Sequence, residues 1–525
     1  MKKTLYVLLS LVMLIGLLAG CADGSSGSSG GDGDTVTISV ALWEVDPAFL
    51  DGDAVYDLVR ERFNIEIVPL SLTWDDYHEK VNTWVATGDM PDVFNIDLLP
   101  YNNKLFFQWV REGVIHPLPG NLSQYPNLQQ IFALDDVAAT AVEGVFYNIP
   151  RGKADASGFA WATARGCYYR KDWAQQLGLN EPTNMNEFVE FVRAMVEGAP
   201  GITGGDVVGI TSYGTSFLID YMWHSMEPRR FGSWQVEADG TVMRAFDAPN
   251  TYEAALTIRN MYNDGLIDPD IAIQDTEAGF NKFATNRAAL VAYQMEGGNE
   301  GMIFDRFIAN NPDKPVGDTI GYLKLLRNEN DGNYYFFNTT SYWSETYISA
   351  DVDEIKLHRI LQLADFFASE EWMDIVKHGI EGVDWKKSGN NVEYLTDDGS
   401  RPDVFSKYRF LEGFSFFSTW FEGVHFWDTS FLIPEVKDMT FEFYDWVVQN
   451  GTPEPQSFAF DMVSTPLSEE FVNDSWDMLM RFLFGRTGGD PRAEWDEIIQ
   501  SLEAAGLSAM VAEMAEAARE SGAIS

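Results

Sequence analysis

The sequence predicts an α/β protein made of two doubly wound lobes. Strand and helix patterns alternate from residue 35 onward, and such alternation produces a parallel sheet covered by helices. A second alternating block begins near residue 166. The chain has 525 residues, which is long for one compact core. Its hydrophobic content of 46% excludes a disordered chain and indicates a globular protein.

The first lobe is predicted from alternating strands and helices joined by short loops. Strands are recognised by a period of two residues and helices by apolar stripes at helical spacing. The segments are a strand over 35–42, a helix over 53–63, a strand over 65–68 before Pro69, a helix capped by Thr73 and ended by Gly88, and a strand over 92–96.

Ligands meet doubly wound sheets at the carboxyl ends of the strands. Trp43 and Glu44 follow the first predicted strand, and Asp97 follows the third. These three residues are therefore candidates for a binding site.

A second lobe is predicted from the middle of the chain, and a later helix is expected to return to the first lobe. The predicted elements are a strand over 167–170, a helix ended by Gly178, a helix with a capping box of Asn184 and Glu187, strands over 288–293 and 320–325, a returning helix over 357–367 and an amphipathic tail over 495–519. The expected boundaries are 35–155 for lobe 1, 156–344 for lobe 2, 345–430 for the return to lobe 1 and 431–525 for a C-terminal helical segment, mostly on lobe 2.

The N-terminus reads as a processing signal followed by a tether. Lys2 and Lys3 precede an apolar run that ends in Leu-Ala-Gly-Cys21. A membrane span needs about 20 apolar residues, and this run is shorter. This resembles a bacterial lipobox, which implies a signal peptide over 1–20 and lipid, such as palmitate, on Cys21. A Gly/Ser tether follows up to residue 34. An ordinary signal peptide, or a core helix with an incidental cysteine, is the alternative.

Charge and motifs exclude several functions. The chain has 80 acidic and 36 basic residues and a formal net charge of -44, which argues against nucleic-acid binding and against electrostatic attachment to anionic membranes. The 6 histidines form no HExxH motif, and no nucleophile elbow, P-loop or dinucleotide fingerprint is present. We therefore expect no enzyme, no cofactor and no metal.

Several blocks resemble family 1 extracellular solute-binding proteins, in particular their larger lipoprotein subgroup. The matching blocks are 80–94 with its Gly-Asp-Met-Pro-Asp-Val core, 169–173, 261–269, 379–385 and 495–506. The resemblance implies a periplasmic-binding-protein-like type II fold with two lobes joined by a hinge. It also implies a monomer that captures a carbohydrate for the permease subunits of an ABC importer. The location would be the extracytoplasmic face of the cell membrane.

A neutral sugar needs flat aromatic surfaces edged by hydrogen-bonding groups. Aromatic and polar residues at loop-like positions are therefore candidates, although any one Trp is more often part of a core. The predicted ligand contacts are Trp43, Glu44, Asp97, Arg151, Tyr169, Trp223, Trp234, Tyr293, Glu296, Glu381 and Trp385.

Other functions stay open at this point. A peptide or cationic small-solute receptor fits the acidic surface, a sensory receptor fits the same fold, and a surface polysaccharide hydrolase or lyase is a more distant alternative. Relatives resembling alginate-binding proteins carry a calcium loop after the second-lobe capping helix. Residues 198–206 offer Asp206 as their one carboxylate, so no calcium is expected there.

Overall fold

The computed structural model describes most of the chain beyond the tether. The described residues are 35–99, 102–152, 162–231, 235–237, 241–243, 248–295, 297–389, 391–414, 434–455, 460, 462–471, 475–485 and 488–524. The predicted signal peptide, Cys21, the tether and the candidate residues Trp234 and Glu296 lie outside this part. Within it, no helix is both long and apolar enough to cross a membrane.

Lobe 1 is built on a five-stranded sheet with the order β2-β1-β3-β12-β4. The three strands β1, β2 and β3 are parallel, and β12 runs antiparallel to both β3 and β4. The bounds are β1 Val36–Trp43, β2 Ile65–Leu72, β3 Val93–Ile96, β4 Ile149–Gly152 and β12 Tyr342–Ile348. Because β12 is antiparallel, its beginning lies at the same edge as the carboxyl ends of β1, β2 and β3.

Helices surround this sheet and bury its apolar side chains in one continuous core. That core joins residues 38–149 to residues 342–414, so the late helices pack on the N-terminal lobe. The elements are η1 Pro47–Phe49, α2 Ala54–Phe63, α3 Tyr77–Thr87, α4 Asn103–Glu112, α5 Pro126–Ile131, α6 Asp135–Ala138, α15 Glu354–Phe367, α16 Glu370–His378, α17 Val404–Lys407 and α18 Arg409–Phe414, with a hairpin of β13 Trp385–Ser388 and β14 Asn391–Tyr394.

Lobe 2 contains a four-stranded sheet with the order β10-β5-β9-β6. Both faces of this sheet are covered, because neighbouring residues along β5 enter different cores: Tyr169 packs with α8, and Tyr168 packs with α13. The strands are β5 Gly166–Arg170, β6 Val208–Ser212, β9 Ala288–Tyr293 and β10 Ile320–Leu323, and a short pair is formed by β7 Gln235–Val236 and β8 Val242–Met243. The helices are α7 Lys171–Leu177, α8 Met185–Gly198, α9 Pro200–Thr203, α10 Thr215–Trp223, α11 Thr251–Asn263, α12 Thr276–Ala284, α13 Gly297–Asn310 and α14 Val316–Thr319.

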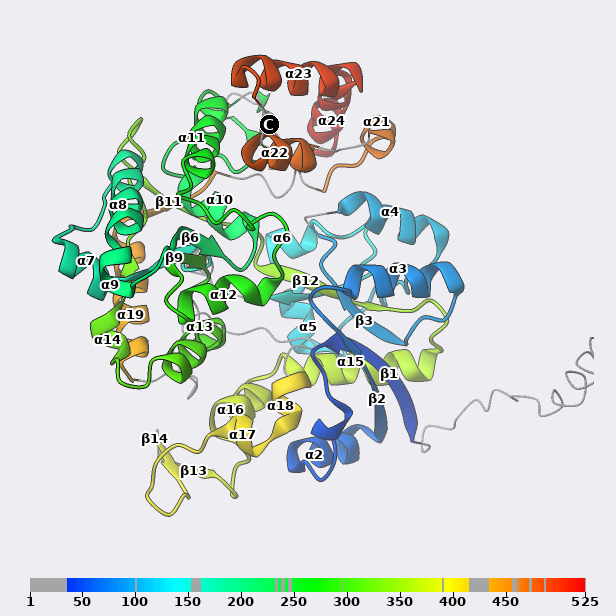
Figure 1. Ribbon diagram of the computed structural model, residues 1–525. Helices are drawn as coiled ribbons and strands as arrows, with labels where there is room; N and C mark the ends of the chain where they lie inside the picture. Colours follow the sequence, from blue (N-terminus) through cyan, green and yellow to red (C-terminus); the bar gives the residue numbers. More distant parts are fainter. Residues whose placement is uncertain are drawn as a thin grey trace, which may run out of the picture.

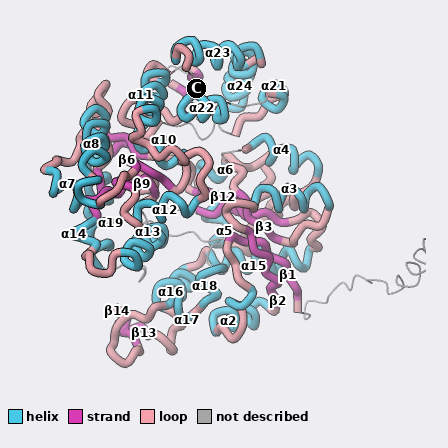
Figure 2. The backbone as a smooth tube through the Cα atoms, in the orientation of Figure 1, coloured by secondary structure: helices cyan, strands magenta, loops and turns pink. Residues whose placement is uncertain are grey.

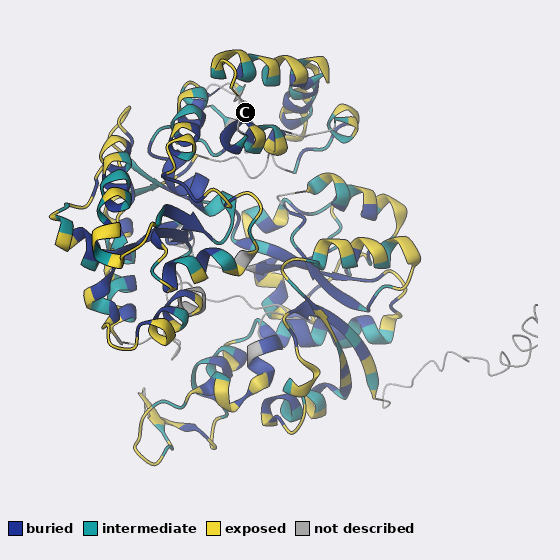
Figure 3. Ribbon diagram, in the orientation of Figure 1, coloured by how far each residue is buried: buried dark blue, intermediate teal, exposed yellow. Residues whose placement is uncertain are grey.

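The C-terminal part covers lobe 2 and reaches toward lobe 1. Its elements are α19 Pro434–Asn450, β15 Gly451–Pro453, which pairs with β11 Tyr334–Phe336, and the helices α21 Pro466–Glu470, α22 Ser475–Phe484, α23 Pro491–Ala504 and α24 Leu507–Ser521. In Figure 1 the two lobes lie side by side with β12 between them, and α21 lies beside α4 at the top. Figure 2 shows the strands of both sheets in magenta among cyan helices, and Figure 3 shows these strands buried beneath helices with exposed outer faces.

The predicted α/β fold with two doubly wound lobes is confirmed, and two local predictions need correction. The strand predicted over 65–68 continues through Pro69 to Leu72, because β2 is an edge strand and a proline there interrupts little of the ladder. Asp76, not Thr73, precedes the next helix. The amphipathic tail predicted over 495–519 lies in two helices, since Gly506 adopts a φ of 98° between α23 and α24.

Candidate functional site

Aromatic side chains gather at the carboxyl edge of the lobe 1 sheet. Trp43, the last residue of β1, stacks on Trp74 with ring centroids 5.1 Å apart and planes 13° apart. Trp343, near the start of β12, lies 5.4 Å from Trp43, and Tyr77 meets the edge of the same ring at 5.2 Å. Trp74 is 42% exposed and Trp43 only 7%, so Trp74 presents the outer surface of the stack.

Polar groups border this stack. Asp97 follows β3, and its Oδ1 accepts a hydrogen bond of 2.9 Å from the Tyr77 hydroxyl. His78 Nε2 lies 3.2 Å from the same oxygen. The indole N–H of Trp43 is buried and has no hydrogen-bond partner among the described residues. A buried donor without a partner is costly.

Arg151 fixes the inner side of the stack. Its guanidinium lies 4.9 Å from the Trp43 ring and 4.7 Å from the Trp343 ring, and Nη1 donates to Ser344 Oγ at 2.9 Å. Burial lowers the pKa of Arg151 to about 9, while Glu345 and Asp97 act in the opposite direction. The side chain is therefore cationic at neutral pH and holds both rings by cation–π attraction.

Glu345 of β12 positions the loop that carries Asp97. Its carboxyl accepts hydrogen bonds from the backbone N–H of Leu98 at 2.8 Å and of Leu99 at 3.2 Å. Burial raises the pKa of Glu345 well above its ordinary value, although these two N–H groups oppose the shift. The loop after β3 is thus tied to the strand next to it.

A second aromatic group lies at the corresponding edge of lobe 2. Tyr213 follows β6, and Tyr293 ends the parallel strand β9, with their rings 5.0 Å apart. Phe217 of α10 lies 4.9 Å from Tyr293, and Phe280 of α12 stacks on Tyr213 at 5.2 Å. Tyr213 and Phe217 are half-buried, so this group also keeps exposed surface.

Residues in the chain segments that run between the two lobes connect the two aromatic groups. Trp343 packs against the small cluster of Ala164 and Phe337. The Arg165 guanidinium lies 3.9 Å from the Phe337 ring and 4.5 Å from the Phe217 ring. Its Nε donates to Asp220 Oδ2 at 2.8 Å. The aromatic side chains therefore form one series across both lobes, which we call the aromatic band: Trp74, Trp43, Trp343, Phe337, Phe217, Tyr293, Tyr213 and Phe280.

The structure brings together five of the sequence-predicted site residues. Trp43, Asp97, Arg151 and Tyr293 belong to the band or its border. Glu44 follows Trp43 at the same edge and is exposed, with a φ of 53°.

Four other predicted contacts lie elsewhere. Trp223 is buried in the lobe 2 core, where its indole N–H donates to the Arg229 carbonyl at 2.9 Å. Tyr169 is buried toward the opposite end of β5 and donates to Glu181 at 2.7 Å. These two were predicted from sequence positions that turn out to be core.

Trp385 and Glu381 belong to the turn and hairpin after α16. The Trp385 side chain is buried and donates to the Gly379 carbonyl at 2.9 Å, while Glu381 is exposed in the adjacent turn. The nearby Asp384 is held by Ile380 N–H and the Tyr408 hydroxyl, at 2.7 and 2.6 Å. Gly379 and Gly382 adopt a φ of 83° in this turn, and the network holds the turn in place, so Trp385 and Glu381 are not part of the site proposed below.

Of the residues that sequence reasoning missed, only Trp74 had a recognisable signal. Trp74 follows the carboxyl end of β2. The predicted strand ended before Pro69, so Trp74 was not recognised as a residue close to a strand end. Trp343 lies at the beginning of an antiparallel strand. The rule that ligands meet the carboxyl ends of parallel strands therefore does not apply to it. Arg165 and Phe337 lie in segments that cross between lobes, which have little compositional signature.

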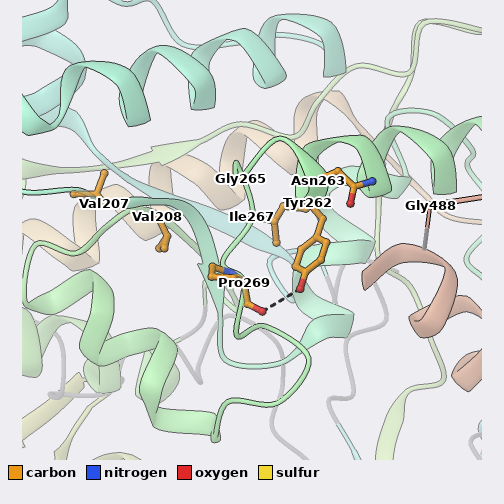
Figure 4. A pocket seen from close by; sticks show the side chains of 8 residues that line it. All are labelled: Val207, Val208, Tyr262, Asn263, Gly265, Ile267, Pro269 and Gly488. Atoms are coloured by element: carbon orange, nitrogen blue, oxygen red, sulfur yellow. Dashed lines mark hydrogen bonds between the residues drawn. The ribbon is translucent and has the colours of Figure 1, made fainter. Parts of the chain in front are cut away.

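Two pockets lie in lobe 2 away from the band. The first has a volume of about 810 Å³ and lies at the start of β6 and the end of α11, where Tyr262 donates to the Pro269 carbonyl at 3.1 Å (Figure 4). Its lining has no charged side chain. The second, of about 420 Å³, lies beside α9 and the turn before β9. Neither pocket includes a predicted contact.

Comparisons with known proteins agree with the observed fold. Residues 47–374 match the family model described as bacterial extracellular solute-binding protein. The chain is 23% identical over 339 residues to Lipoprotein LipO of Bacillus subtilis, covering 60% of this chain and 61% of LipO. It is 22% identical to the polygalacturonan/rhamnogalacturonan-binding protein YtcQ of Bacillus subtilis, covering 74% of this chain and 75% of YtcQ.

Two solved structures share the architecture. One is the alginate-binding protein AlgQ2 without calcium ion, with a TM-score of 0.68, 18% identity and coverage of 92% of this chain and 98% of that chain. The other is the ABC-transporter substrate-binding protein FusA of S. pneumoniae with kestose, with a TM-score of 0.67, 18% identity and coverage of 93% and 100%. At these identities the likeness shows the fold. Since the family model matches more than half of its length, the chain belongs to the bacterial extracellular solute-binding proteins.

Proposed function

We propose that this protein captures an oligosaccharide between its two lobes and delivers it to the permease subunits of an ABC importer. The observation that carries the proposal is the aromatic band, which runs from Trp74 in lobe 1 to Phe280 in lobe 2. Rigid aromatic rings supply apolar area for sugar faces at low entropic cost, and the partly exposed carboxylate of Asp97 supplies directional hydrogen bonds. Known carbohydrate receptors among the relatives and structural neighbours support this reading.

The charges along the band favour an uncharged glycan. Arg165 is already paired with Asp220 at 2.8 Å, and Arg151 faces Glu345 and Asp97. A uronate carboxylate would add negative charge beside Asp97 and Asp220 without an obvious counterion, in a chain of net charge -44. We therefore place this receptor with those that take neutral oligosaccharides, and not with those that take pectin fragments or alginate.

The anchoring is part of the same proposal. Lipid on Cys21 and the Gly/Ser-rich tether up to residue 34 would hold the receptor at the extracytoplasmic face of the membrane while its lobes close on the ligand. Ligand-driven closure would shift the protein toward a state that the permease recognises. Mass spectrometry of the membrane-extracted protein would show diacylated Cys21 as its first residue if this is correct.

Calorimetry with a panel of ligands tests the substrate class. Neutral oligosaccharides, including fructo-, xylo- and malto-oligosaccharides, are compared with oligogalacturonate, alginate oligosaccharides and short cationic peptides. We expect at least one neutral oligosaccharide to bind with a dissociation constant of micromolar order, and acidic glycans to bind at least about tenfold more weakly. Binding of cationic peptides alone would replace the carbohydrate proposal with a peptide receptor, and tight binding of uronates would overturn the preference for neutral ligands.

A further inference from the structure

The pocket beside α9 lies at the edge of the lobe 2 sheet opposite to the aromatic band. Gly166 of β5 pairs with Tyr293 at the band, whereas Arg170 ends β5 next to the turn that begins β9. The pocket has a volume of about 420 Å³ and is bordered by the end of α9 with the turn that follows it, 202–206, and by the turn 285–287, with Trp173 and Lys314 completing its lining. It occupies the place after the second-lobe capping helix where calcium-binding relatives are expected to carry their loop.

Cationic side chains dominate this lining. Arg287 has no ion-pair partner among the described residues, and its Nε donates to Thr285 Oγ1 at 3.2 Å. Lys314 Nζ is 3.7 Å from Asp172 Oδ2, which is longer than a hydrogen bond, and the Lys314 side chain is 42% exposed. Asp206 is the one carboxylate in the lining. Two cations with weak pairing therefore face a single pocket in a strongly acidic protein.

A buried arginine supports the pocket from behind. Arg170 is fully buried, its Nε and Nη2 donate to the two oxygens of Asp172 at 2.9 and 2.6 Å, and its Nη1 donates to Asn286 Oδ1. The guanidinium lies 4.3 Å from the ring of Trp173. Asn286 and Trp173 both line the pocket, so this network fixes its walls. It also leaves the Asp172 charge largely neutralised by Arg170.

This arrangement does not fit calcium. Calcium takes about six to eight oxygen ligands and favours several carboxylates. Here one lining carboxylate stands beside Lys314 and Arg287, and the described residues contain no group of three or more potential metal ligands. A divalent cation would be repelled by the positive side chains that line the site.

We propose that this pocket binds an oxyanion, such as phosphate or the phosphate group of a larger molecule, through Lys314 and Arg287. Ammonium and guanidinium groups form charge-assisted hydrogen bonds to such oxygens. The site is separate from the aromatic band, so the proposal stands or falls independently of carbohydrate binding.

Calorimetry and thermal unfolding of the purified protein at constant ionic strength test this proposal. The probes are inorganic phosphate, glycerol 1-phosphate and calcium chloride, each compared with sodium chloride. Inorganic phosphate is expected to bind with a dissociation constant of about 1 mM or lower and to raise the melting temperature, whereas calcium should not. Tighter binding of glycerol 1-phosphate would identify a phosphate group on a larger molecule, and equal or weaker binding would identify the free ion; both support the site.

Variants distinguish phosphate binding in this pocket from a general effect of surface charge. The double substitution Lys314→Gln with Arg287→Gln is expected to weaken phosphate binding at least tenfold while oligosaccharide binding stays unchanged. Lys104→Gln, at an exposed lysine on α4 of lobe 1, is the matched control and should bind phosphate like the unmodified protein. The proposal is wrong if phosphate does not bind, if the double variant binds it equally well, or if calcium raises the melting temperature.

Discussion

Glu345 is a buried acid whose role depends on its protonation state. Burial raises its pKa well above the ordinary value of 4.5. A carboxyl with a raised pKa holds its proton more tightly in the folded state. Its contribution to stability is therefore largest below pH 4.5 and is lost as the pH rises through the folded-state pKa.

Glu345→Gln removes this pH dependence, because an amide cannot lose a proton. We expect the variant to gain stability relative to the unmodified protein as the pH rises from 4.5 to neutral, by about 1.4 kcal/mol for each unit by which the pKa is raised. Urea unfolding at several pH values measures the difference. A difference that stays constant across the range would show that Glu345 is ionised in the folded protein.

Individual residues also show what sequence could and could not foresee. Trp43 and Asp97 were predicted because strand ends can be recognised by alternation and because ligands gather there. Trp223 and Trp385 were predicted on loop-like surroundings, but a single tryptophan carries no information on which way its ring points. Their indole N–H groups bond to nearby backbone carbonyls, and no sequence pattern encodes that contact.

At the scale of elements, the turn between β2 and α3 positions Trp74. Asp76 Oδ1 accepts from the Thr73 N–H at 3.0 Å, and Asp76 Oδ2 lies 2.8 Å from Lys80 Nζ. The hydrogen bond from Lys80, followed by that from Thr73, lowers the pKa of Asp76 to about 2. Because the pKa is lowered, the stabilising effect is present above the ordinary value of 3.8 and is lost as the pH falls through about 2.

Asp76→Ala is expected to loosen this turn and weaken oligosaccharide binding by a few fold, since Trp74 would no longer be held against Trp43. Calorimetry at neutral pH measures the loss, and an NMR titration of the Asp76 carboxyl should give a pKa near 2. An Asp76 pKa at 3.8 or above, or unchanged affinity in the variant, would show that this turn does not position Trp74 for ligand binding.

Strands and helices were more predictable than the connections between them. Alternation revealed β1, a continuous apolar run revealed β9, and the predicted Gly88 and Gly178 helix ends are present as left-handed caps. The crossing segments could not be located, because Phe337 and Arg165 acquire their roles only when residues far apart in the chain meet. Long-range contacts of this kind leave no local period in the sequence.

On the scale of the whole molecule, one ion pair connects lobe 1 to the C-terminal segment. Arg111 of α4 lies 2.8 Å from Glu469 of α21, and α21 is in turn tied to α24 by a hydrogen bond from the Leu467 N–H to Glu513. Both partners are partly exposed, and such pairs contribute about 0.2–1 kcal/mol. The contact holds the two lobes together on this side.

Arg111→Ala and Glu469→Ala are each expected to weaken ligand binding by up to about fivefold, and the double variant should lose no more than either single variant. Calorimetry at low and high salt measures this coupling, which screening should reduce. The Arg62–Glu371 pair, which lies within lobe 1 and is similarly exposed, is the control and should leave affinity unchanged. Equal effects from both pairs would mean that the connection between the lobes is not involved.

The central claim is that the aromatic band binds the ligand, and Trp74 is its most exposed member. Trp476 of α22 is similarly exposed, at 37% against 42%, and takes no part in the band. Calorimetry of Trp74→Ala and Trp476→Ala, with the neutral oligosaccharide that binds best, compares the two. We predict that Trp74→Ala weakens binding at least about tenfold and that Trp476→Ala leaves it unchanged. Unchanged binding in Trp74→Ala, or an equal loss in both variants, would contradict the assignment of this site.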